Sequence, residues 1–252
     1  MSPPAAVALR WMEVAIALGI VQGTIELLAI RAAYADDGIW RWATLKRDLG
    51  WFRILLRYRL FLFVLAVRLL AALLLLGGVR GATAPILWVT TLLVSVRFLG
   101  TFNGGSDSMT MVVLSALVVA HVGNAWPLAQ RGALVYVAVQ SIMSYCIAGL
   151  VKLANDDWRR GRALASFMEN PQFAVPGVVT RLLQPATASR LVSRLVMAFE
   201  CSFPAVLAGP PVAAAFLIGA AAFQLGNVAV FGLNRFFFAW AATWPAVWYL
   251  SS

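Results

Sequence analysis

The sequence predicts an all-α, polytopic transmembrane helix bundle of about eight spans with no sizeable soluble domain. Of the 252 residues, 62% are apolar and only 12% are charged, which is far from the mixture found in soluble globular proteins. Apolar runs of about 20 residues follow one another with short breaks, and runs of that length cross the hydrocarbon core of a bilayer. We therefore expect the lipid bilayer to be the solvent for most of a single domain over residues 1–252.

Eight stretches are apolar enough to cross about 30 Å of hydrocarbon at about 1.5 Å per helical residue. They are 11–30, 54–76, 84–99, 109–123, 132–153, 191–208, 211–231 and 236–250. Gly209, Pro210 and Pro211 separate the sixth stretch from the seventh, and proline predicts a tight turn there because it ends a helix. The first stretch is expected to be retained as a span, since no short apolar core ends in a small-residue cleavage site.

The basic residues indicate a membrane location and give an orientation. Twenty Lys and Arg residues stand against ten acids, for a net charge of +10. They flank the apolar runs instead of forming one stripe, which favours anionic lipid headgroups over nucleic acid as the partner. The connections 31–53 and 155–190 are both basic and an even number of spans separates them, so the positive-inside rule places both in the cytoplasm. We expect a multi-pass protein of a cell membrane, the bacterial inner membrane.

The densest set of polar residues follows an apolar helix that ends near Lys152. Asp156, Asp157 and Trp158 come directly after it. In one interpretation Lys152 extends to the membrane interface, Trp158 lies in the aromatic belt and an aspartate caps the next helix. In the other, Lys152 lies in a partly dehydrated pocket that lowers its pKa, and acts as a general base.

Three further polar residues lie inside predicted spans. Glu200 is well within a helix, where a charge costs about 2.5–3.5 kcal/mol, so we expect it to pair with Lys152 or an arginine. That pair is either a structural bridge between helices or part of a site. Gln224 and Asn227 are three residues apart on one helical face, so they reach the same interior space, as helix–helix contacts or as site residues.

The familiar catalytic and metal-binding motifs are absent from the sequence. His121 is the only histidine, and we expect it in a loop or at the interface, because one histidine without clustered acids makes a poor metal site. Cys146 and Cys201 are far apart, so there is no CxxC spacing. The turn over 103–107 lacks a phosphate-binding pattern, and Ser106 or Asp107 is expected to cap the helix that follows it.

Three segments resemble successive motifs of the horizontally transferred transmembrane (HTTM) domain, the membrane domain of vitamin K-dependent gamma-carboxylase. They are IAGLVKLANDDWRRGRAL, FECSFP and FQLGNVAVFGLNRFFFAW. The likeness runs from about Arg97 to the C-terminus. The first 95 residues are similar mainly in hydrophobic pattern. The combination of motifs is more specific than any one of them.

The resemblance implies a role for Lys152, at the position of the family's base that deprotonates vitamin K hydroquinone. It also implies that this lysine opens toward the lumenal side, in contrast to the side given by the positive charges. The family's Phe-His-x-x-Asn segment corresponds to Phe223–Asn227, where Gln224 replaces the histidine. Glutamine hydrogen-bonds but does not titrate. The carboxylase also carries a large lumenal region, whereas this chain ends at Ser252, so we expect a membrane domain alone.

Two functions from different classes follow from these residues. The first is a membrane enzyme with Lys152 as its base, in which Trp158, Glu200, Gln224 and Asn227 line a cavity for a quinol-like lipid or a peptide. It predicts a lateral opening to lipid. The alternative is a non-catalytic membrane subunit or a peptide-maturation partner, which predicts a filled core. Transport is less favoured because no inverted repeat is visible.

Overall fold

A computed structural model describes residues 5–43, 54–98, 104–170, 173 and 175–252 of the chain. Every regular element within these ranges is a helix, and no strand occurs among them, which confirms the all-α prediction. Asn103, in the expected turn, and the basic residues Lys46, Arg47 and Arg53 lie outside the described residues.

The contacts gather into two compact units, which the expectation of a single domain did not anticipate and which leave that expectation untested. The N-terminal unit holds the described residues up to Val137 together with Phe238–Ala246. The C-terminal unit holds Ala138–Phe237 and Val247–Ser252. Three helices contribute residues to both units: α5 (Pro127–Ala154), α11 (Asn234–Ala241) and α12 (Trp244–Ser251).

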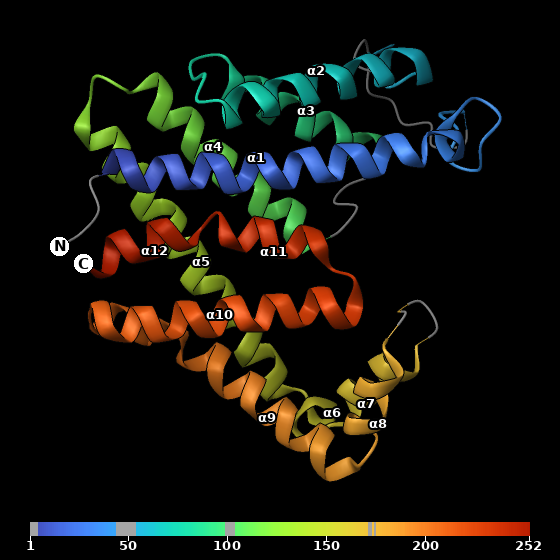
Figure 1. Cartoon of the computed structure of the whole chain (residues 1–252), viewed down its shortest axis with the longest axis vertical. Helices are drawn as coiled ribbons and strands as arrows, with labels where there is room; N and C mark the ends of the chain where they lie inside the picture. The colour runs from blue at the N-terminus through green and yellow to red at the C-terminus, as the bar shows by residue number, and fades with distance from the viewer. Residues whose placement is uncertain (1–4, 44–53, 99–103, 171–172, 174) are drawn as a thin grey trace. The chain divides into compact units, whose positions relative to one another are not determined.

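Four helices that follow one another along the chain form the core of the N-terminal unit. They are α1 (Ala5–Ala29), α2 (Tyr58–Leu76), α3 (Thr83–Arg97) and α4 (Gly105–Val122), with the short helix η1 (Arg31–Tyr34) after the first. Helix α1 packs against α2, α2 against α3, α3 against α4, and α4 returns to α1 (Figure 1). The closed ring of contacts buries one face of each helix, and the remaining apolar faces point outward.

The C-terminal unit contains shorter helices between two long ones. Its elements are α6 (Asp156–Arg159), α7 (Arg162–Glu169), α8 (Gly177–Leu183), α9 (Ala186–Ser202), η3 (Phe203–Ala208) and α10 (Pro210–Phe231), beside the second part of α5. Gly161, between α6 and α7, has φ +77, and a Cβ there would lie 2.6 Å from the backbone nitrogen of Arg190. The Ser189 hydroxyl donates to the Gly161 carbonyl at 2.6 Å. Glycine at this turn therefore lets α6 and α7 lie directly on the start of α9.

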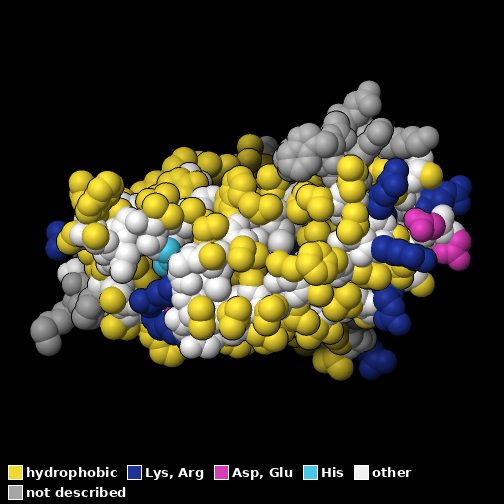
Figure 2. Space-filling view, turned by 90° about the horizontal axis from the view of Figure 1, so that it is seen from above, with side chains coloured by type: hydrophobic (Ala, Val, Ile, Leu, Met, Phe, Trp, Pro, Cys, Tyr) yellow, Lys and Arg dark blue, Asp and Glu magenta, His cyan; other side chains and the backbone are white. Residues whose placement is uncertain are grey.

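The described residues include six helices long and apolar enough to cross a membrane, with mean hydropathies of 1.4 to 2.5. The chain is therefore a multi-pass membrane protein by helix length and hydropathy. Figure 2 shows one face on which hydrophobic side chains cover the middle and basic side chains gather toward the ends. Such a band between basic margins is typical of a protein surrounded by lipid.

Two of the eight expected spans differ from the prediction. The stretch 84–99 is the 15-residue helix α3, which is shorter than the usual length for crossing the hydrocarbon core. The stretch 236–250 is divided between α11 and α12, because the helix is interrupted at Ala242 and Thr243. The Thr243 hydroxyl donates to the Trp240 carbonyl at 2.7 Å, which satisfies one of the carbonyls at the end of α11.

The caps of two helices also differ from the prediction. Asn155, and neither Asp156 nor Asp157, caps α6: its side-chain oxygen accepts from the backbone nitrogens of Asp157 and Trp158. Helix α4 begins at Gly105, so Ser106 and Asp107 lie within its first turn and not at the capping position. Asp107 still lies where a carboxylate is favourable, because the N-terminal end of a helix carries partial positive charge.

A buried cluster of aromatic side chains surrounds the guanidinium of Arg97 at one end of the N-terminal unit. The rings of Tyr34, Trp42, Phe61 and Phe98 all lie within 6 Å of its central carbon. The guanidinium donates to the backbone carbonyls of Tyr34 and Trp40. Cation–π attraction and these two hydrogen bonds offset part of the cost of burying the charge. The cluster gives the start of the 31–53 connection a fixed structure.

Burial, with a smaller contribution from Tyr58, raises the pKa of the Tyr34 phenol from 10.0 to about 12. The fold therefore favours the neutral phenol, whose stabilising contribution is complete below pH 10.0 and is lost as the pH rises toward 12. We expect Tyr34→Phe to remove one phenol from the latest step of an alkaline titration followed by phenolate absorbance. The control is Tyr136→Phe on the exposed face of α5. A late step of unchanged size in Tyr34→Phe would contradict this assignment.

Candidate functional site

Gly149 brings α5 and α9 into backbone contact in the C-terminal unit. A Cβ at this position would lie 2.6 Å from the backbone nitrogen of Cys201 and 2.9 Å from the carbonyl carbon of Glu200. Real Cβ atoms do not approach backbone so closely, so any larger residue would force the helices apart. Glycine within the apolar helix is therefore required by packing, and Lys152 follows it by one turn on the same helical face.

Lys152 and Glu200 form a two-pronged ion pair between these helices. The Lys152 ammonium donates to both carboxylate oxygens of Glu200, with Nζ–O distances of 2.8 and 2.6 Å. The Glu200 side chain is 4% exposed and the Lys152 side chain 20% exposed. The pairing expected for Glu200 is thus present. Its carboxylate forms the inner end of the pair, and the lysine forms the end nearer the surface.

Trp158 covers the outer end of the pair. The Lys152 ammonium lies 5.3 Å from the centre of the Trp158 indole ring, within the range of a cation–π contact. The ring belongs to α6, which Asn155 holds in place by capping its first turn. Trp158 therefore contributes to the environment of Lys152, and both sequence interpretations are partly correct: the lysine approaches the surface, and it does so as a partner of Glu200.

Gln224 and Asn227 form a separate hydrogen-bonded group around Tyr145. The Asn227 amide donates to Gln224 at 3.4 Å, and the Gln224 amide donates to the Tyr145 hydroxyl at 3.3 Å. Tyr145 precedes Lys152 by seven residues on the same face of α5, or about 10 Å along the helix axis. The ring of Tyr145 stacks on Phe203 at 4.1 Å between ring centres. Aromatic packing thus holds the polar group two turns away from the ion pair.

A charged cluster outside the spans surrounds the start of the 155–190 connection. Asp156 pairs with Arg159, Arg160 and Arg162, and Arg162 also contacts Asp157. Desolvation raises the pKa of the Asp156 carboxyl, but the hydrogen bonds and charges of the three arginines outweigh that effect and hold its pKa below the ordinary value. Both aspartates are therefore occupied by arginines, and Lys152 has Glu200 as its carboxylate.

The sequence prediction named the charged and amide residues of this site but missed the residues that hold them. Tyr145 and Phe203 read as ordinary core residues, and Gly149 as an isolated helical glycine, until the two helices are placed together. A glycine one turn before an intramembrane lysine was the available signal for a close approach. Within the described ranges, no group of three or more His, Cys, Asp or Glu side chains is arranged to bind a metal ion.

Substituting Gly149 tests whether helix proximity creates the ion pair. We expect Gly149→Ala to lower stability by about 1–3 kcal/mol, because the added methyl group overlaps the backbone of α9. The measurement is thermal unfolding of the purified protein in detergent. Gly132→Ala is the matched control in the same helix, because a Cβ there meets no atom within 4 Å. Equal stability of the two variants would contradict the close contact.

A double-mutant cycle measures the coupling between Lys152 and Glu200. We expect Lys152→Met and Glu200→Gln each to destabilise the protein, with the lysine substitution costing about 3–5 kcal/mol because it leaves a buried carboxylate unpaired. The double variant should be more stable than the sum of the two single changes, since neither charge remains. Additive losses in thermal unfolding would show that the two groups do not interact.

No protein family matches this chain. No curated protein matches it, and no solved structure does. The similarity of its motifs to the HTTM domain stays a prediction that rests on those motifs alone.

Proposed function

We propose that this protein is an HTTM-like enzyme of the bacterial inner membrane that takes a proton from a lipid-soluble, quinol-like substrate or from a peptide. The single observation that supports this proposal is the Lys152–Glu200 pair, held between two membrane helices with its lysine end nearer the surface. Ionisable pairs inside spans usually mark substrate or proton pathways, because a purely structural contact is made at lower cost by apolar side chains.

The pair accepts a substrate proton without an additional base. The Lys152 ammonium first transfers a proton to the Glu200 carboxylate, which leaves a neutral amine beside a neutral carboxylic acid. Neither form of the pair carries net charge, so the apolar surroundings penalise this transfer less than they penalise the separation of charges. The amine then takes the proton of a substrate hydroxyl. The pair gains one positive charge, and the deprotonated substrate oxygen stays next to the new ammonium.

The residues around the pair support a flat, partly aromatic substrate. Trp158 offers a ring face next to Lys152, and a ring of a quinol fits against it. The Tyr145, Gln224 and Asn227 group supplies hydrogen bonds deeper in the unit. In the HTTM-like interpretation Gln224 holds a substrate oxygen in place, and the whole proton transfer belongs to Lys152 and Glu200 because glutamine does not titrate.

The test compares wild type with Lys152→Met and Lys152→Arg in detergent, each supplied with a quinol and a glutamate-containing peptide. Quinol oxidation and carbon dioxide fixation are both measured. We expect turnover in wild type and a loss of at least about 100-fold in both variants, because general bases contribute at least that factor and arginine does not deprotonate. Arg159→Gln, on the exposed part of α6, is the control and should keep full turnover.

Two outcomes would decide against an enzyme. Turnover that survives in Lys152→Met would remove the lysine from the chemistry. An absence of turnover in wild type, together with a variant that folds equally well, would favour the alternative of a non-catalytic subunit or peptide-maturation partner. The two-pronged geometry of the ion pair favours that alternative in one respect, because it satisfies both charged groups as a structural bridge between helices would.

A further inference from the structure

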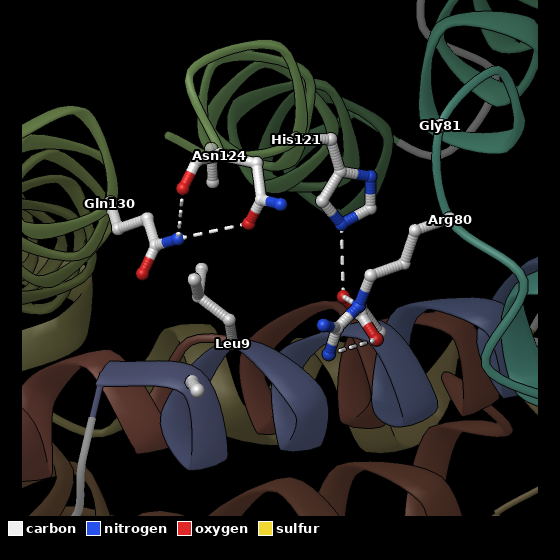
Figure 3. A pocket seen from close by; sticks show the side chains of 9 residues that line it. Leu9, Arg80, Gly81, His121, Asn124 and Gln130 are labelled. Atoms are coloured by element: carbon white, nitrogen blue, oxygen red, sulfur yellow. Dashed lines mark hydrogen bonds and ion pairs between the residues drawn. The ribbon is translucent and has the colours of Figure 1, made fainter. Parts of the chain in front are cut away.

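A second set of ionisable residues lines a cavity in the N-terminal unit. The cavity measures about 220 Å³, and its walls come from the start of α1, the α2–α3 turn, the end of α4 and the start of α5 (Figure 3). The lining residues are Ala6, Leu9, Glu13, Arg80, Gly81, Ala120, His121, Asn124 and Gln130. All of them lie near the ends of membrane helices, so the cavity belongs to the boundary of the apolar region.

Glu13 is fully buried and organises one wall of this cavity. Its carboxylate accepts from Arg10 at 3.0 Å and from Arg80 at 2.8 Å, and it contacts the ring of His121 at 2.9 Å. Arg10 is also held by the backbone carbonyls of Leu75 and Leu76 at the end of α2. Two guanidinium charges therefore face one carboxylate, and the wall keeps a net positive charge even when the histidine is neutral.

Donor groups remain for a ligand in this cavity. Arg80 uses Nε and Nη2 on Glu13, and its side chain is 46% exposed, so the Nη1 side of the guanidinium is accessible. Gln130 donates to both oxygens of Asn124, which turns the Asn124 amide nitrogen toward the space beside His121 and Arg80 (Figure 3). A guanidinium and an amide thus approach the same space from different elements.

The chemistry of the walls selects the class of ligand. The surplus of guanidinium charge repels cations and attracts anions. A tetrahedral phosphate offers oxygens in several directions, which suits donors on separate elements better than a planar carboxylate does. The cavity is smaller than the pockets that enclose whole drug-sized ligands, which start at about 300 Å³. It therefore fits a headgroup whose remaining part lies outside.

We propose that this cavity binds a phosphate group, carried by a phospholipid headgroup or by a free phosphate ester. Arg80 and Asn124 contact its oxygens, and Glu13 with Arg10 and His121 fixes the position of Arg80. Ala6 and Leu9 give the apolar wall that a glycerol backbone follows toward the lipid. Val7 and Trp11, exposed on the neighbouring face of α1, continue that apolar surface outward. This site is independent of the reaction proposed for Lys152.

The experiment titrates the full chain, in a phosphate-free maltoside detergent, with inorganic phosphate and with dihexanoyl phosphatidylglycerol, using calorimetry and empty micelles as the reference. We expect saturable binding in wild type and a loss of affinity of about tenfold or more in Arg80→Gln, because a charge-assisted hydrogen bond is removed. Asn124→Ala should lose affinity to a smaller extent. Tighter binding of the lipid identifies a headgroup site, and tighter binding of inorganic phosphate identifies a site for free phosphate esters.

The control is Arg131→Gln, an exposed arginine at the start of α5 that does not line the cavity and carries the same charge. Glu13 keeps Arg10 and His121 as partners in Arg80→Gln, so that variant is expected to fold. Should its thermal unfolding differ from that of wild type, Arg80→Lys and Asn124→Ala carry the test. The proposal is overturned if neither probe binds saturably to wild type, or if Arg131→Gln weakens binding as much as Arg80→Gln does.

Discussion

The backbone contact between α5 and α9 at Gly149 is the constraint on which the candidate site depends. Helices usually lie 8–10 Å apart, a separation at which a lysine and a glutamate meet only with extended side chains (about these values,). A glycine at the contact removes the intervening side chain and brings the Glu200 carboxylate onto the Lys152 ammonium. Once the charges are this close, each is the other's solvation, and a position that would expel either alone becomes tolerable for both.

Both units solve the problem of buried charge by pairing, but with different surpluses. Lys152 and Glu200 balance one another in the C-terminal unit. Glu13 in the N-terminal unit contacts two arginines and a histidine, so positive charge remains. A neutral pair suits a group that gains and loses a proton, because its surroundings need not change their field. A wall with surplus positive charge instead suits a ligand that brings a negative charge of its own.

Hydropathy predicted most of the helices because the length of an apolar run is a local property. It failed for 236–250, where composition is apolar throughout and the break between α11 and α12 depends on backbone geometry at Thr243. The pairing of Lys152 with Glu200 was predictable because an intramembrane carboxylate needs a cation and few were within reach. The contact of Glu13 with His121 was not, because 108 residues separate them and each alone resembles a residue at an interface.

The two ends of the Lys152–Glu200 pair differ in access, and this difference assigns their roles. Glu200 is almost fully enclosed, whereas the lysine keeps about a fifth of its side chain exposed beneath Trp158. A substrate therefore meets the nitrogen first and reaches the carboxylate only through it. Both carboxylate oxygens are already bound to Nζ, so Glu200 is placed to hold the lysine's orientation and to store its proton. In the proposed reaction, the reactive atom is the Lys152 nitrogen, and Glu200 is the group that allows it to become neutral in an apolar environment.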